Sequence, residues 1–66
     1  MVILLNGVAH TCAQTTSVAT LLEELRLEQR GIAVARNSVL VPHSQYATVF
    51  LAENDELEII QAVAGG

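Results

Sequence analysis

The pattern of apolar residues predicts strands at both ends of this chain and a helix between them. Residues 2–5 are an apolar, β-prone run, and residues 8–12 form a second short β-prone segment. Between them stand Asn6 and Gly7, the strongest short signal for a hairpin, because both residues tolerate positive φ. The start of the chain therefore predicts two antiparallel strands joined by a tight turn.

The segment after this hairpin carries an apolar stripe with helical spacing. Its members fall at positions i, i+3, i+4 and i+7, and they are Val18, Leu21, Leu22 and Leu25. Ser17 precedes the stripe as an N-cap residue, whose hydroxyl accepts from an orphan backbone N–H. Arg26 and Arg30 suit the negative end of the helix dipole, and Gly31 is a natural residue just past that end. We expect one helix over residues 17–30.

A second hairpin is expected in the middle of the chain. Residues 32–36 form a short β segment, and Asn37 and Ser38 make a turn. Residues 39–41 return along the first segment. Pro42 ends that strand or marks a sheet edge, because proline cannot donate to a ladder.

The remaining residues predict a loop, a turn and a last strand. Residues 43–50 form an irregular loop or a short 3₁₀ turn, which is pinned by three side chains: Tyr46, Val49 and Phe50. Residues 53–55 favour a turn, because Asn and Asp side chains bond readily to their own backbone. Residues 57–63 form the final strand.

The order of these elements indicates an α+β domain. Two strands, a helix and three further strands make a β-grasp, a mixed sheet of four to five strands with the helix packed on one face. The crossover that contains the helix lets the first and last strands lie side by side in parallel at the centre. No repeat or linker divides the chain, so residues 1–66 are expected to form a single domain.

Alternation along the first and last strands assigns their side chains to two faces. The set expected beneath the helix is Ile3, Leu5, Leu57 and Ile59. The set expected on the uncovered face is Val2, Leu4, Ile60 and Ala62. We call this second set the docking patch and expect it to contact a partner protein. The alternative is ordinary surface, since single exposed apolar side chains need no explanation.

Composition supports a core held by apolar packing and an apolar surface for a partner. The chain is 52% hydrophobic and only 15% charged, against about 25% charged in an average protein. Its net charge of −4 argues against nucleic acid, which needs a basic stripe. Cys12 is the only cysteine, so it can form no internal disulfide, and we expect a small buried hydrophobe. Cys12, His10 and His43 lack the spacing of a metal site.

Two further features bear on location and on catalysis. No apolar run is long enough to span a membrane, and residues 1–6 lack the basic start of a signal peptide. We therefore expect a cytoplasmic protein with no membrane partner. Nothing suggests an enzyme acting alone, because the triple of Ser17, His43 and Asp55 is of a kind that any sequence yields.

The end of the chain carries the candidate chemistry. The last strand segment runs directly into Ala64, Gly65 and Gly66. Because glycine has no β-carbon, two glycines let backbone slide into a channel that excludes side chains. We expect residues 63–66 to be a flexible tail in which Val63, Ala64 and Gly65 thread into a partner and the Gly66 carboxylate reacts. A frayed terminus is the alternative.

These features together resemble the thiamine-biosynthesis sulfur carrier family (ThiS), which has a ubiquitin-like β-grasp fold. The similarity covers nearly the whole chain, through its element order, its short length, and residues 33–42 and 56–66. Its more specific parts are the valine–proline step at 41–42 and the last four residues. Two positions depart from the family: His43 stands where arginine is frequent, and Tyr46 stands where tryptophan is common. Both could alter a partner contact.

The resemblance implies a protein co-substrate and not an enzyme. An E1-like adenylating enzyme would use ATP and Mg²⁺ to convert the Gly66 carboxylate to an acyl adenylate. Sulfur from a sulfur-donor protein would then give a thiocarboxylate, which thiazole synthase would use to build the thiazole of thiamine. The chain itself would bind no cofactor and no metal. Alternatives are a molybdopterin synthase small-subunit-type carrier, a ubiquitin-like protein modifier and a β-grasp regulatory binding module.

Overall fold

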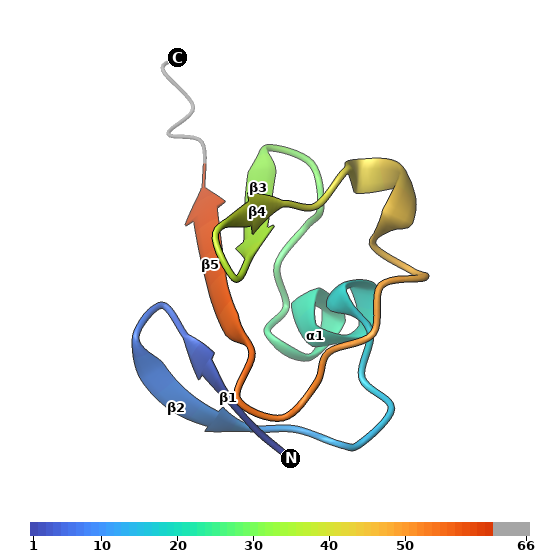
Figure 1. The fold of residues 1–66 in the computed structure, drawn as a ribbon. Helices are drawn as coiled ribbons and strands as arrows, with labels where there is room; N and C mark the ends of the chain where they lie inside the picture. The colour runs from blue at the N-terminus through green and yellow to red at the C-terminus, as the bar shows by residue number, and fades with distance from the viewer. Residues whose placement is uncertain (62–66) are drawn as a thin grey trace.

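The computed structural model describes residues 1–61, so Ala62 and the expected tail over residues 63–66 lie outside the described residues. The described elements are β1 (Val2–Leu5), β2 (Val8–Thr11), α1 (Val18–Glu24), β3 (Ile32–Arg36), β4 (Val39–Leu40), the 3₁₀ turn η1 (His43–Gln45) and β5 (Glu56–Gln61). The five strands form one sheet in the order β2-β1-β5-β3-β4, and α1 lies against one side of it (Figure 1). The predicted α+β fold with a mixed sheet is confirmed.

β5 occupies the centre of the sheet. It pairs in parallel with β1, where Leu4 lies opposite Glu56 and Leu5 opposite Leu57. On its other side it pairs antiparallel with β3, from Arg36 opposite Leu57 to Ile32 opposite Gln61. The expectation of parallel first and last strands is therefore correct.

The helix begins where the sequence predicts. The Ser17 hydroxyl accepts a hydrogen bond from the Thr20 backbone N–H at 3.1 Å, as an N-cap side chain does. The side chains of Val18, Leu21 and Leu22, which form the apolar stripe of the helix, are all buried. The apolar face of α1 thus covers the sheet.

The predicted end of the helix at residue 30 is wrong, because α1 ends at Glu24. Arg26 adopts a φ of 59°, in the left-handed region, and its N–H donates to the Glu23 carbonyl at 3.0 Å. The Leu27 N–H then donates to the Leu22 carbonyl at 2.9 Å, which completes a Schellman ending. The physical reason is that the apolar stripe stops at Leu25, whereas leaving the helix lets Leu27 pack against the core.

The helix-facing side of the sheet is confirmed as the core. Ile3 and Leu57 are fully buried, and Leu5 and Ile59 are partly buried against the same cluster. The other main members of this cluster are Cys12, Val18, Leu21, Leu22, Ile32, Val34, Tyr46 and Leu51. The expectation that Cys12 is a small buried hydrophobe is also confirmed.

The loop after β4 is pinned by one aromatic side chain and not by two. Tyr46 is 1% exposed, and its hydroxyl donates to the Ile32 carbonyl at 3.5 Å. The expectation that Phe50 also pins the loop is wrong, because its side chain is 55% exposed. Main-chain bonds hold this part instead: Val18 N–H donates to Val49 O at 3.0 Å and Leu51 N–H to Thr16 O at 2.9 Å.

Candidate functional site

The expected reactive end lies just beyond the described part of the chain. β5 ends at Gln61, five residues before Gly66. Ala62, Val63, Ala64, Gly65 and Gly66 lie outside the described residues, so their roles stay predictions. The structure describes the region next to this segment, which comprises the uncovered face of the sheet and the turns that flank β5.

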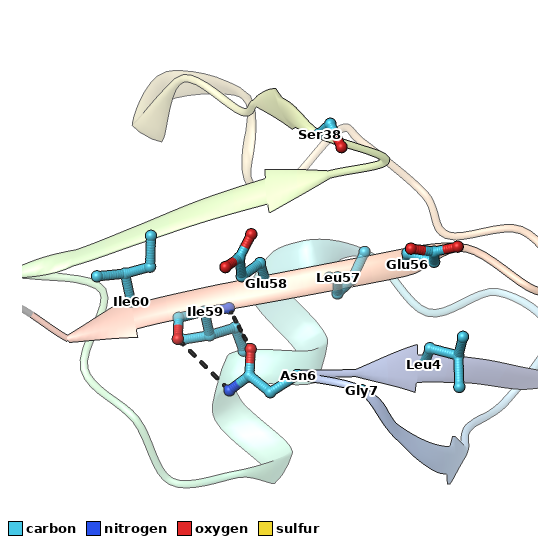
Figure 2. Close-up of a pocket in the computed structure, with 9 residues that line it drawn as sticks. All are labelled: Leu4, Asn6, Gly7, Ser38, Glu56, Leu57, Glu58, Ile59 and Ile60. Carbon is cyan, nitrogen blue, oxygen red and sulfur yellow. Dashed lines mark hydrogen bonds between the residues drawn. The ribbon is translucent and has the colours of Figure 1, made fainter.

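Three docking-patch residues lie on the uncovered face, as alternation predicts. Val2 is 40% exposed, Leu4 is 39% exposed and Ile60 is 51% exposed. Two carboxylates share this face, because Glu56 and Glu58 alternate with the core residues of β5 (Figure 2). Since Leu4 lies opposite Glu56, that carboxylate lies beside Leu4, and Glu58 lies between this pair and Ile60 along β5. The face is therefore apolar at two places with negative charge between them.

Small and apolar residues of β3 and β4 extend this face beyond the predicted set. Ala33, which is partly exposed, lies opposite Ile60, and Ala35, which is buried, lies opposite both Glu58 on β5 and Leu40 on β4. Leu40 is 67% exposed. Leu40 is absent from the docking patch expected from the sequence, because the face on which Leu40 lies depends on the register between β3 and β4. The position of the turn at Asn37 was the only sequence signal for that register.

Asn6 connects the first hairpin to the last part of β5. Asn6 and Gly7 both have positive φ, of 50° and 83°, as the two-residue turn between β1 and β2 requires. The Ile59 N–H donates to the Asn6 side-chain Oδ1 at 2.8 Å, and Asn6 Nδ2 donates to the Ile59 carbonyl at 3.5 Å (Figure 2). We call this pair of bonds the Asn6 clamp. The sequence identified Asn6 only as a turn residue.

Asn37 makes a related arrangement at the opposite end of β5. It opens the two-residue turn between β3 and β4 with a φ of 50°, and Ser38 follows with a φ of 72°. The Glu56 N–H donates to Asn37 Oδ1 at 3.0 Å, and Asn37 Nδ2 donates to Asp55 Oδ1 at 3.1 Å. Each neighbouring hairpin therefore holds one end of β5 through the asparagine at the first position of its turn.

Asp55 anchors the turn that enters β5. Its carboxylate accepts from Arg36 Nε at 2.7 Å and from the Ala52 backbone N–H at 2.7 Å, in addition to Asn37. Burial acts to raise the pKa of Asp55, but the bonds from Ala52, Asn37 and Arg36 outweigh it and hold the pKa below its usual value. The expected turn at residues 53–55 is present, with the Asp55 N–H donating to the Ala52 carbonyl at 3.1 Å. It is tied to β3 through Arg36 and to β1 through the Leu4 N–H, which donates to the Asp55 carbonyl at 2.9 Å.

The structure does not join the triple of Ser17, His43 and Asp55. Ser17 caps α1, Asp55 is held by Arg36, and the His43 Nε2 lies 3.3 Å from the Gln29 carbonyl. Within residues 1–61 no group of three or more His, Cys, Asp or Glu side chains is arranged to hold a metal ion. No helix among those residues is long and apolar enough to cross a membrane. What residues 1–61 provide is a sheet in which β5 is paired with β1 on one side and with β3 on the other.

Comparison with known proteins identifies the relatives of this chain. The profile of the ThiS family matches residues 3–66. The sulfur carrier protein ThiS of Escherichia coli is 39% identical over 66 residues, which are all of this chain and all of that protein. A crystal structure of the thiamine biosynthesis protein ThiS from Geobacter metallireducens superposes with a TM-score of 0.85 at 23% identity, and each chain is covered completely.

Some similar proteins are much longer. A thiazole synthase of Paramagnetospirillum magneticum is 38% identical over 66 residues, which span all of this chain but only 20% of that protein. A thiazole synthase of Magnetococcus marinus is 35% identical, again over all of this chain and 20% of that protein. The chain thus matches a fifth of these synthases and the whole of the carrier. Because the family profile covers nearly every residue, this chain belongs to the ThiS family.

Proposed function

We propose that this chain is the sulfur carrier protein of thiamine biosynthesis. The observation that carries the proposal is its 39% identity to the Escherichia coli sulfur carrier over the full length of both chains. The fold agrees, since the mixed sheet and single covering helix match a ThiS structure from end to end. The role is that of a co-substrate, because the chain supplies the group that reacts while its partners supply catalysis.

The chemistry follows from the properties of a terminal carboxylate. The Gly66 carboxylate is ionised at neutral pH, and its charge makes it a poor electrophile. A partner adenylating enzyme, using ATP and Mg²⁺, joins it to AMP and releases pyrophosphate. The terminal sulfur of a cysteine persulfide on a sulfur-donor protein then attacks the activated carbonyl, and AMP leaves. After the S–S bond is reduced by a thiol, the product is a thiocarboxylate at Gly66.

The described domain contributes a fixed base for this end. Five residues follow Gln61, and a fully extended chain of that length spans at most about 17 Å. Such a reach lets a terminal glycine enter a pocket while the folded domain stays outside. β5, from which this end of the chain continues, lies between β1 and β3 and is therefore a central strand and not an edge strand.

The partner surface follows from the charges on the uncovered face. The docking patch would contact the adenylating enzyme through Leu4 and Ile60. Glu56 lies beside Leu4, and Glu58 lies between Leu4 and Ile60, so a matching surface needs lysine or arginine there to avoid leaving carboxylates unpaired. Thiazole synthase is proposed as a second partner, supported by the two thiazole synthases that contain a segment similar to this whole chain.

Intact-mass spectrometry tests the function directly. The chain is incubated with the adenylating enzyme encoded in the same genome, ATP, Mg²⁺ and a sulfur source, and we expect one oxygen to be replaced by sulfur. Fragmentation should place the change at Gly66, and a chain that lacks Gly66 serves as the matched control. Full modification of that control would refute the site. Lysine-linked adducts that resist thiol reductants would instead indicate a protein modifier.

A further inference from the structure

The Asn6 carboxamide takes the place of a peptide group in the ladder between β1 and β5. β1 ends at Leu5, and the next bond of the ladder runs from the Asn6 N–H to the Leu57 carbonyl at 2.9 Å. In a continuing parallel ladder the Asn6 main-chain carbonyl would accept from the Ile59 N–H. The turn conformation of Asn6 ends the strand there, and its side-chain oxygen accepts from Ile59 instead.

The same side chain also supplies a donor. Asn6 Nδ2 lies 3.5 Å from the Ile59 carbonyl, which a residue further along β1 would otherwise have reached. Both polar groups of the Ile59 main chain are thus engaged by one carboxamide. The clamp lengthens the β1 side of the ladder by two residues of β5 beyond Leu57, although β1 itself has already turned away.

The clamp marks the last place at which β5 is held from both sides. Beyond Ile59, β5 pairs within residues 1–61 on the β3 side, where Ile60 lies opposite Ala33 and Gln61 opposite Ile32. Without the clamp, the last anchor on the β1 side would move back to Leu57. The last four residues of β5, and not only the last two, would then be held on the β3 side alone, just before the segment that leads to Gly66.

We propose that Asn6 is a positioning residue, which fixes the point at which β5 leaves the sheet and so presents the terminal carboxylate to the adenylating enzyme. This inference rests on the proposed function. Order in β5 that the free protein already possesses does not have to be acquired on docking. Loss of the clamp should therefore raise the KM for the carrier and leave kcat unchanged, because the extra ordering is needed for binding and not for chemistry.

Two matched variants separate positioning from stability. Asn6→Gly keeps the positive φ of the turn and removes the carboxamide. Asn37→Gly makes the same change at the same turn position, also at a φ of 50°, but removes bonds to Asp55 and Glu56 at the far end of β5. Both variants lose side-chain bonds to β5, and only the first loses them next to the tail. Asn6→Asp keeps an acceptor for the Ile59 N–H, so the Ile59 amide should stay protected in that variant; loss of protection there would show that the acceptor oxygen is not what holds Ile59.

Amide hydrogen exchange followed by NMR measures the clamp without any partner. In the wild-type chain the Ile59 amide should be protected, and in Asn6→Gly it should exchange at least about tenfold faster, as expected for an amide that loses its only acceptor. The Ile60 amide, which faces β3, should change far less. Equal protection of Ile59 in the two proteins would show that the clamp does not hold β5.

ATP–pyrophosphate exchange with the adenylating enzyme measures the consequence. We expect Asn6→Gly to raise the KM for the carrier about tenfold, the cost of ordering about one more backbone residue, with kcat within about twofold of wild type. Asn37→Gly should keep the wild-type KM at temperatures where it is folded. An unchanged KM for Asn6→Gly, beside an active wild-type chain, overturns the positioning role alone. A wild-type chain that is not adenylated overturns the proposed function and the positioning role with it.

Discussion

Replacement of Asp55 by asparagine tests whether one buried carboxylate holds the entrance to β5. Asp55 is 6% exposed and accepts from three donors, on Ala52, Arg36 and Asn37. An asparagine at this position has one acceptor oxygen, and its own NH₂ group would face a donor. The variant therefore keeps some of the geometry but loses the charge and leaves at least one donor without its acceptor.

The expected loss of stability is a large part of the total. Hydrogen bonds to charged groups contribute about 1.5–3 kcal/mol each. The Arg36 side chain is 33% exposed, so water replaces part of what it loses. We expect Asp55→Asn to lower the free energy of unfolding by about 2–3 kcal/mol. A 66-residue domain has roughly 3–10 kcal/mol in total, and the Tm should fall by about 10–20 °C.

The pH dependence gives this prediction a second test. The pKa of Asp55 is held below its usual value in the folded protein, because the hydrogen bonds outweigh the opposing effect of burial. A lowered folded pKa contributes stability that is fully present above the unfolded pKa, about 3.9, and is lost as pH falls through the folded value. The difference between wild type and Asp55→Asn should be full at neutral pH and should shrink below about pH 4.

Urea denaturation followed by far-UV circular dichroism measures both effects, at pH 7 and again at pH 3. Glu24→Gln, a change of an exposed helix carboxylate, is the matched control and should be nearly neutral. A loss below about 0.5 kcal/mol for Asp55→Asn at pH 7 would show that the network does not stabilise the turn. An equal loss at both pH values would show that the carboxylate charge is not the cause.

Three further predictions use the same folded protein. Arg26→Gly should raise the free energy of unfolding by about 0.5–1 kcal/mol in urea denaturation, because glycine adopts the φ of 59° without strain; a decrease would contradict the Schellman ending. Tyr46→Ala should lower the free energy of unfolding by about 3–5 kcal/mol, and Phe50→Ala by no more than about 0.5 kcal/mol, in the same urea denaturation. Equal losses in the two variants would contradict the different burial of the two side chains. Glu58→Arg should raise the KM for the carrier in ATP–pyrophosphate exchange without changing stability, and a lower KM would exclude a basic partner surface.

Features that depend on near neighbours could be predicted from the sequence. The Asn6 and Gly7 turn follows from the backbone freedom of two adjacent residues. The start of α1 follows from a hydroxyl at Ser17 and an N–H three residues later. Strand alternation placed Ile3 and Leu57 in the core and Leu4 on the uncovered face, because the period of a strand is fixed by its backbone.

Other features were decided only by the tertiary structure. The helix ends at Glu24 because Leu27 has a core to pack against, and that core includes residues of distant strands. The Phe50 side chain faces solvent because main-chain bonds to residues 16–18 already hold its segment.

The Asn6 clamp joins residues 53 positions apart in the sequence. A carboxamide can replace a peptide group only where the assembled sheet brings a strand beside it. The sequence thus determined the elements and their faces through local backbone and side-chain chemistry. Tertiary structure decided where the elements stop and what holds β5, because those outcomes depend on contacts that exist only after the sheet has formed.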